Sequence, residues 1–432
     1  MHGGWFHSAE TGSVTACSAS PYLWRGCVRS VSLAQGAFSC GKGESGTISH
    51  QPRWGAKHLR CGYTTGTCAA LAASGAVDLL LGGRAPERVS LVTPAGTAVT
   101  VPLAEAVLLD GGDSARCAVV KDGGDDPDIT SGMLVCATVK RIPAGIQIDG
   151  GAGVGRVTKP GLDQPVGAAA INRVPRRMIK AQVRQRCEAL GYTGGIAVTI
   201  SIPGGAKAAE KTFNPMLGVV GGLSILGTSG IVEPMSERAI IDTIAIQERQ
   251  AAVLGARGLI LTPGNYGVDF LQRTGWIQPQ VPVVKCSNFI GEALDCAAEL
   301  GFAQVLLVGH IGKLVKVAGG IMNTHSRAAD CRMELFCAYS AVCGADAALC
   351  RGLMEAATTD ACIALLDEAG LRAAVLDRLL DAIQRRLEQR AAGAYEVGAV
   401  VFSNEYGLLG ETRQAGWIRG DLLQRKLEEG ED

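Results

Sequence analysis

Residues 221–236 read GGLSILGTSGIVEPMS, and the order of residue types predicts a strand, a glycine-rich loop and a helix start. Residues 223–226 form an apolar run typical of a buried strand. The loop 227–230 follows, and Ser236 is a favourable N-cap for a helix. A strand that leads through such a loop into a helix is the opening unit of a parallel α/β sheet. We therefore expect an α/β domain to begin here.

The sequence after residue 216 continues this alternation of strands and helices. Apolar strands are expected at 258–261, 281–285, 304–308 and 397–402, and helices at 237–254, 291–300, 328–342 and 371–390. Buried strands separated by helices indicate parallel βαβ units. Residues 217–432 are therefore predicted to form a doubly wound, Rossmann-like domain that binds ligands at the carboxyl ends of its strands.

The preceding sequence has a different pattern. Residues 58–216 contain short alternating runs at 89–92, 98–101, 117–120, 134–141 and 196–202. Two helices are expected among them, one at 67–81 and one that begins at Pro175 and ends at Gly191. This pattern predicts an α+β domain. Residues 1–57 are rich in Gly and Ser and show no periodicity, so we expect a poorly ordered N-terminal extension.

Composition excludes several classes of protein. The 41 basic and 41 acidic residues give no net charge, which argues against general nucleic-acid binding. The longest uncharged stretch, 212–232, contains too many glycines and polar residues for a membrane helix, and no signal peptide is apparent. The 15 cysteines include no C-x-x-C pair, so we expect free thiols and a cytoplasmic location.

Two motifs in the first domain could bind a ligand. The turn Gly-Tyr-Thr-Thr-Gly at 62–66 places Thr64 and Thr65 before an alanine-rich helix, where they could bind an anion or simply cap the helix. The segment KDGGDDPD at 121–128 has four carboxylates in seven residues. These could hold a cation, supply a general base, bind ligand amines or form a solvated turn. The segment lacks the pattern of an EF-hand calcium loop.

Glycines and cations follow these motifs. The stretch 150–161 is glycine-rich and contains Arg156 and Lys159, but it is not a P-loop. Arg176, Lys180 and Arg184 lie four residues apart on one stripe of the expected helix. That stripe is either a solvated basic face or a clamp for a polycarboxylate or phosphate.

The α/β domain has its own candidate loops. Residues 227–233 could hold an adenosine-type cofactor, with Glu233 accepting hydrogen bonds from ribose hydroxyls, or could form a structural crossover. The loops 264–267, 309–313 and 319–326 follow expected strands and carry His310, Lys313 and His325. We expect them to gather at one edge of the sheet.

Taken together and in order, these motifs resemble the cobalt-precorrin-5B (C1)-methyltransferase family (the CbiD family) of anaerobic cobalamin biosynthesis. The resemblance covers about residues 59–417 and includes the motifs at 62–66, 121–128, 153–162, 211–215, 222–236 and 323–326. Arg173 stands where the family usually has proline, a change that loosens the turn and adds a positive charge.

The resemblance implies methyl transfer from S-adenosylmethionine to carbon 1 of a cobalt-containing tetrapyrrole, with cobalt present only as part of the substrate and no metal site in the protein. The oligomeric state is left open, with a homo-oligomer as one possibility.

The cofactor site is our inference from the expected α/β domain and does not come from the family. The candidate catalytic residues are Asp125, Asp126, His310 and His325. The candidate cofactor-binding residues are Gly227, Thr228, Gly230, Glu233, Asn265 and Tyr266. The candidate substrate-binding residues are Thr64, Thr65, Lys121, Arg156, Lys159, Arg176 and Lys180.

Two other functions fit the residues. A small-molecule kinase or nucleotide-dependent ligase would use the 150–161 loop on phosphates, and a corrinoid carrier would bind the tetrapyrrole without a nucleoside.

Overall fold

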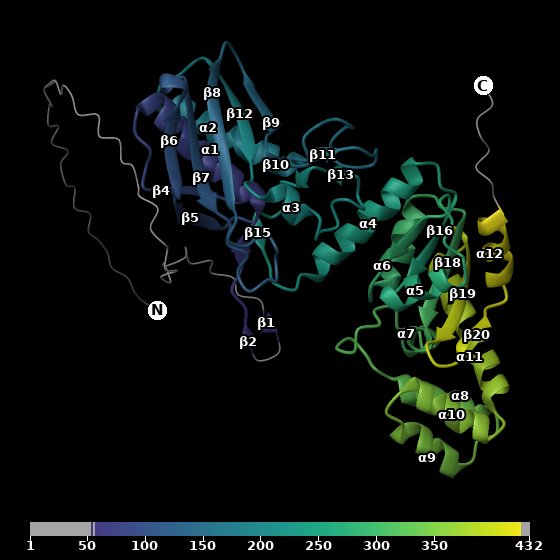
Figure 1. Ribbon diagram of the computed structural model, residues 1–432. Coiled ribbons are helices and arrows are strands. Elements are labelled where there is room, and N and C mark those ends of the chain that lie inside the picture. The colour runs from purple at the N-terminus through teal and green to yellow at the C-terminus, as the bar shows by residue number, and fades with distance from the viewer. Residues whose placement is uncertain (1–52, 55–56, 425–432) are drawn as a thin grey trace, which may run out of the picture. The chain divides into compact units, whose positions relative to one another are not determined.

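The computed structural model describes residues 53–54 and 57–424 of the chain (Figure 1). The extension expected at residues 1–57 therefore lies almost entirely outside the described residues. At its end, β1 (Arg53–Trp54) pairs antiparallel with β2 (Lys57–His58). We call residues 59–235 the N-terminal region and residues 236–424 the C-terminal region. Both contain helices and sheets, so this is a mixed α/β protein.

The N-terminal region is built on a five-stranded sheet with the order β6-β7-β8-β12-β9. Neighbouring strands are antiparallel except β12 and β9, which are parallel. The strands are β6 (Glu105–Leu109), β7 (Ser114–Val120), β8 (Leu134–Ile142), β9 (Ile146–Gly150) and β12 (Gly195–Ser201). The strands expected at 117–120, 134–141 and 196–202 are confirmed within this sheet. Those expected at 89–92 and 98–101 form a separate hairpin, β4 (Arg88–Val92) and β5 (Ala98–Pro102).

Two helices, α1 (Thr65–Gly82) and α2 (Arg173–Ala189), pack against each other beside this sheet (Figure 1). They confirm the two helices expected in the N-terminal region. By length and composition α1 could cross a membrane, but 89% of its apolar stretch is buried inside the fold. Its small residues allow close packing, since a β-carbon on Gly75 would lie 2.8 Å from Leu103 Cδ1. It is the central core helix of the region.

Residues 217–235 pair with earlier strands of the N-terminal region. The short strands β13 (Val219–Val220), β14 (Gly222–Leu223) and β15 (Ile231–Val232) pair with β11 (Arg156–Val157), β10 (Gly153–Val154) and β3 (Gly62–Tyr63) respectively. The prediction that residues 223–226 open the parallel sheet is therefore wrong. An apolar run predicts a strand but not its distant partner, which here is β10. The boundary placed at residue 216 stays a prediction, although these pairings keep 219–232 with the N-terminal region. The region also contains η1 (Asp110–Gly112) and α3 (Gly205–Ala209).

The C-terminal region contains a second five-stranded sheet with the order β17-β16-β18-β19-β20. The first four strands are parallel, and β20 is antiparallel to β19. The strands are β16 (Gly258–Thr262), β17 (Val283–Lys285), β18 (Gln304–His310), β19 (Glu396–Ser403) and β20 (Gly407–Glu411). The four strands expected after residue 257 are all confirmed, and only β20 is additional.

Helices cover both faces of this sheet. Successive residues of β16 face opposite cores: Leu259 and Leu261 pack with α6 and α7, whereas Ile260 packs with α5 and α12. The helices are α4 (Glu237–Val253), α5 (Asn265–Arg273), α6 (Ile290–Glu299), α7 (Ile311–Ala318), α8 (Arg332–Val342), α9 (Ala347–Glu355), α10 (Thr359–Glu368), α11 (Arg372–Ala391) and α12 (Ala415–Gln424). The helix expected at 328–342 begins only at Arg332, because the buried Lys316 ammonium binds the Thr324 and Ala329 carbonyls and so holds the preceding loop.

Candidate functional site

The first charged motif, residues 121–128, holds itself together with a nearly buried ion pair. Lys121 is 2% exposed, and its Nζ lies 2.7 Å from Asp128 Oδ2. Thr130 donates its backbone N–H and its hydroxyl to the same carboxylate. Burial alone would raise the pKa of Asp128, but the Lys121 charge and these hydrogen bonds lower it overall. Lys121 is therefore occupied within the fold, which does not favour its expected role in substrate binding.

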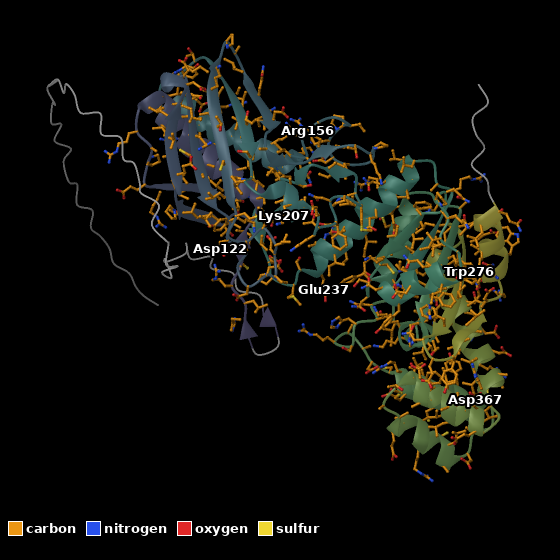
Figure 2. The ribbon with its side chains drawn as sticks, in the orientation of Figure 1. Asp122, Arg156, Lys207, Glu237, Trp276 and Asp367 are labelled. Carbon is orange, nitrogen blue, oxygen red and sulfur yellow. The ribbon has the colours of Figure 1, made fainter. Side chains whose placement is uncertain are left out.

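The other carboxylates of this motif also have partners in the fold. Asp122, labelled in Figure 2, makes a bidentate ion pair with Arg60 at 2.5 and 2.9 Å. Asp125 accepts the backbone N–H of Arg60, and Asp126 accepts that of Met235. These contacts favour the structural alternative for the loop. The catalytic roles of Asp125 and Asp126 stay predictions.

The Gly-Tyr-Thr-Thr-Gly turn caps α1 and binds the loop that follows β14. Thr64 Oγ1 accepts the N–H of Thr67 at 3.2 Å, and Thr65 Oγ1 accepts that of Leu226 at 3.0 Å. A β-carbon on Gly227 would lie 2.4 Å from Thr64 Cγ2, so glycine is needed for this packing. The helix-capping alternative therefore accounts for both threonines, and their substrate contacts stay predictions.

The loop at 227–233 is held against α1 and the β4–β5 hairpin. Thr67 Oγ1 donates to the Gly230 carbonyl at 2.7 Å, and Ala95 N–H donates to that of Ser229 at 3.0 Å. Its strands do not belong to the parallel sheet, so the expected position at that sheet's carboxyl edge is wrong. The cofactor-binding roles of Gly227, Thr228, Gly230 and Glu233 stay predictions without that support.

The glycines at 150–161 pack against other parts of the N-terminal region. A β-carbon on Gly153 would lie 1.9 Å from the Ile202 carbonyl oxygen, and one on Gly155 would lie 2.3 Å from Val219 Cγ1. Close protein packing thus explains glycine at these positions. Arg156, also labelled in Figure 2, forms an exposed ion pair with Asp149 at 2.7 Å.

The basic surface of α2 differs by one position from the expected stripe. Arg176 turns into the fold, where its guanidinium donates to the carbonyls of Ile171, Ile148 and Ala169 at 2.8, 2.9 and 3.3 Å. Arg176 is thus half-buried and held by the fold, but it still lines the cavity described next, so its expected role in substrate binding stays a prediction. The exposed cations of this helix are instead Arg173, Arg177, Lys180 and Arg184.

These four cations, which we call the α2 basic face, line a cavity together with Arg176 and with residues 161–164, 227 and 228. Arg173 pairs with Asp163 across 3.6 Å. Within residues 57–424, no ion pair or hydrogen bond of the side chains of Arg177, Lys180 or Arg184 is found. Exposed cations without carboxylate partners favour an anionic ligand at this face.

A second cavity of about 320 Å³ lies at the carboxyl ends of β16 and β18. Its lining combines the start of α5, the start of α7, Arg332 at the start of α8, and residues 358–360 before and at the start of α10. The loops 264–267 and 309–313 do meet there, as expected. His325 lies outside its lining, and that residue's Nδ1 accepts the N–H of Arg327 at 3.1 Å.

His310 caps α7 inside this second cavity. Its Nδ1 accepts the N–H of Gly312 at 3.1 Å, which in the neutral ring places the proton on Nε2. Burial lowers the pKa of His310, and the carboxylate of Asp360 opposes this shift only in part. At neutral pH His310 is therefore a hydrogen-bond donor through Nε2, which does not favour the role of general base in that tautomer.

Lys313 extends beneath the same cavity. Its ammonium donates to the carbonyls of Pro263 at 2.7 Å and Ser287 at 3.3 Å. Burial lowers its pKa. Two of its three protons are thus bound by the fold, and one is left for a ligand.

His310 provides a testable pH dependence. Because its pKa is lowered in the folded state, the unfolded chain binds a proton that the folded chain does not, so this group reduces stability as the pH falls through about 6.5. Replacing it by Asn, a good helix cap, removes the titration. Urea unfolding at pH 7 and pH 5 should show a smaller loss for His310→Asn than for wild type. Equal losses would contradict the prediction.

Several site residues were missed by sequence reasoning. Arg177 belongs to the basic cluster of α2 but was left off the expected stripe. The phase of the helix could have placed it on the exposed side, since it lies about 160° from the buried Ile179, whereas Arg176 lies about 60° from that residue. Residues 358–360 reach the second cavity from a distant helical segment, and no local pattern places them there. Among the described residues, no group of three or more His, Cys, Asp and Glu is arranged to hold a metal ion.

Comparisons with known proteins agree with this arrangement of motifs. The CbiD family model matches residues 53–234, and the model of the CbiD C-terminal domain matches residues 323–413. A cobalt-precorrin-5B C(1)-methyltransferase from Ruminiclostridium cellulolyticum is 45% identical over 81% of this chain and 90% of the relative. One from Photorhabdus laumondii is 44% identical over 83% of this chain and 94% of the relative.

A solved structure is also similar in sequence. The crystal structure of a cobalamin biosynthesis protein (cbiD) from Archaeoglobus fulgidus is 29% identical, covers 63% of this chain and 84% of its own, and has a TM-score of 0.35. The family models and the relatives at 40–45% identity decide the classification. This chain belongs to the CbiD family.

Proposed function

We propose that this protein transfers a methyl group from S-adenosylmethionine to carbon 1 of cobalt-precorrin-5B, giving cobalt-precorrin-6A. The observation that carries this proposal is the 40–45% identity, over most of both chains, to relatives named for this reaction. The substrate brings its own cobalt, so the protein needs no metal of its own. We also propose that the C-terminal sheet is a doubly wound, Rossmann-like sheet, since helices cover both of its faces.

The α2 basic face is the proposed binding surface for the carboxylate arms of the substrate. A tetrapyrrole intermediate carries several acetate and propionate groups, which are anionic at neutral pH. The protein has no net charge, so attraction of such a ligand needs a local cluster of cations. Arg177, Lys180 and Arg184 supply that cluster, and none of them forms an ion pair in the part of the chain that the structure describes. Arg156 and Lys159 are proposed as additional substrate contacts.

For this reaction the protein has to align the methyl donor with the ring carbon more than it has to activate either of them. When bound, S-adenosylmethionine supplies an electrophilic methyl group on its sulfonium, and the electron pair of the broken carbon–sulfur bond stays on sulfur. Because the ring carbon of the substrate is itself electron-rich, the binding residues would have to hold it in line with the methyl group, and no protein nucleophile would be needed. Orientation by the binding residues can contribute about 7–11 kcal/mol of barrier reduction. The described residues suit a nucleoside, because Tyr266, His310, Lys313 and Asp360 offer an aromatic ring, donors and an acceptor around one cavity.

A cytoplasmic location is part of the proposal. All twelve cysteines in the described part of the chain are free thiols, and seven of them are buried. Free thiols suit a reducing compartment. The expectations that the protein binds neither nucleic acid nor membrane stay predictions, and its oligomeric state is left open.

The decisive experiment is incubation with S-adenosylmethionine and cobalt-precorrin-5B, followed by mass spectrometry for one added methyl group. Parallel incubation with ATP tests the kinase or ligase alternative, which loses support because glycines 153 and 155 pack against protein. Binding of the tetrapyrrole without methyl transfer would favour the carrier.

The basic face gives a quantitative prediction. Arg177→Gln, Lys180→Gln and Arg184→Gln combined should raise the KM for the tetrapyrrole by about 10- to 100-fold, because each exposed cation contributes a modest, screened interaction. The salt dependence of KM should weaken as well. Steady-state kinetics at two salt concentrations measures both effects.

A matched control neutralises three exposed cations elsewhere, Lys207, Arg378 and Arg385. It should leave KM nearly unchanged. Equal effects of the two triple variants would show that only net charge matters, and would remove the assignment to α2.

A further inference from the structure

The order of strands in the C-terminal sheet reverses between β16 and β18. After β16 the chain passes through α5 to β17 on one side, and it then returns through α6 to β18 on the other side. The helices α5 and α7, which follow these two neighbouring strands, pack on opposite faces of the sheet. Diverging helices leave a crevice at the carboxyl ends of the two strands, which is where open α/β sheets bind ligands.

The 320 Å³ cavity coincides with this crevice. Its size is at the lower end of the range for small-molecule sites. The walls are fixed by tight packing, since a β-carbon on Gly267 would lie 1.6 Å from Thr262 Oγ1, and one on Gly309 would lie 3.0 Å from Leu314 Cγ. Glycine at both positions therefore lets α5 and α7 begin directly at the strand ends. Topology and cavity geometry thus indicate the same place independently.

The side chains around the cavity offer complementary contacts. Tyr266 is 62% exposed at the mouth, with its ring centroid 6.1 Å from that of His310. Asp360 uses Oδ1 to accept the Ser403 hydroxyl at 2.5 Å, and no hydrogen bond to its Oδ2 is found within residues 57–424. His310 has its Nε2 proton and Lys313 one ammonium proton available.

We propose that this cavity binds the methyl donor as a nucleoside, with the adenine ring against Tyr266, the ribose hydroxyls on Asp360, and the amino-acid carboxylate near Lys313 and the start of α7. This inference rests on the proposed function and moves the cofactor from the 227–233 loop to the switch between β16 and β18. Carboxylates accept ribose hydroxyls in related sheets, and a helix start together with an ammonium attracts an anion.

Titration calorimetry of the full chain with S-adenosylhomocysteine tests this site. Asp360→Asn keeps the acceptor for Ser403 but removes the charge, and should weaken binding about 10- to 150-fold. Tyr266→Ala should weaken it about 5- to 100-fold, since its ring is expected to stack on the base. Tyr266→Phe should stay within about twofold of wild type, because it retains the ring. Melting temperatures establish that each variant is folded.

Two further variants separate this site from its competitors. Glu405→Gln removes an exposed carboxylate near Ser403 and controls for charge alone. Glu233→Gln tests the 227–233 loop. Wild-type affinity in folded Asp360→Asn and Tyr266→Ala would overturn the inference, as would a loss of binding confined to Glu233→Gln.

A methyl-transfer assay in parallel distinguishes this failure from a failure of the proposed function. Wild-type protein that binds S-adenosylhomocysteine and transfers methyl, with both cavity variants unaffected, would overturn the site and leave the function intact. Wild-type protein that neither binds it nor transfers methyl would overturn both.

Discussion

Lys121→Met should lower the free energy of unfolding by about 3–5 kcal/mol, because removing one partner of a buried ion pair leaves the other charge uncompensated. The Lys121 side chain is almost fully buried, whereas that of Asp128 is 22% exposed. Water reaches the carboxylate in part, so the lower end of the range is expected. Urea unfolding at pH 7 measures the loss, with the exposed Lys140→Met as the matched control.

The pH dependence of this pair has a defined sign. The pKa of Asp128 is lowered in the folded state, so the pair stabilises the fold above the ordinary aspartate pKa near 3.8 and loses that contribution as the pH falls below it. Wild type should therefore lose more stability than Lys121→Met between pH 5 and pH 3. The double variant Lys121→Met/Asp128→Asn should recover part of the loss at pH 7. A loss below about 1 kcal/mol in the single variant would place the pair among ordinary surface ion pairs.

This pair shows how the motifs and the fold are related. Residues 121–128 contain four carboxylates close together in the sequence, and this pattern suggests a catalytic site. In the structure, Lys121, Thr130 and Arg60 supply partners for two of them, and backbone N–H groups bind the other two. A sequence shows which charges are available but not which of them the fold itself uses.

The parallel sheet was predictable for a local reason. β16 and β18 are nearly continuous apolar runs between turn residues, and such runs indicate strands that are buried on both faces. Residues 223–226 have a similar composition, yet Leu223 pairs with Val154 in the N-terminal region. Composition identifies a strand, whereas its neighbour depends on contacts between residues far apart in the chain.

The residues around the second cavity also fall into those that the sequence could place there and those that it could not. Loops 264–267 and 309–313 could be placed together because both follow parallel strands, whose carboxyl ends share one edge. Asp360 could not, because α10 lies about fifty residues beyond β18 and reaches the cavity only through tertiary packing. The loops that line the cavity could therefore be predicted from the sequence, whereas the contribution of Asp360 is seen only in the structure.

A buried carboxylate in α4 interrupts an apolar stripe that the sequence does show. Glu248 follows Ile244 by four residues and precedes Ala251 by three, and both of those residues are in the core. Its side chain is fully buried, and neither carboxylate oxygen has a hydrogen-bond partner in residues 57–424. Burial raises its pKa to about 8, and the nearby thiol of Cys296 opposes this shift only in part. The carboxyl group is thus neutral when the protein is folded at pH 7.

Glu248→Gln should therefore stabilise the protein at alkaline pH. Between the ordinary glutamate pKa of 4.5 and about 8, the folded chain holds a proton that the unfolded chain releases, so wild type loses stability as the pH rises through this window. The variant has no such proton. Its gain in free energy of unfolding should be near zero at pH 5 and about 3–5 kcal/mol at pH 8.5, since each pKa unit is worth about 1.4 kcal/mol.

Urea unfolding of both proteins at the two pH values measures this difference. The exposed Glu299→Gln in α6 is the matched control and should show no pH-dependent gain. A gain of equal size at pH 5 and pH 8.5 would mean that packing, and not ionisation, separates the two side chains. No gain at either pH would mean that Glu248 finds a partner in solution, and its pKa would then lie near the ordinary value.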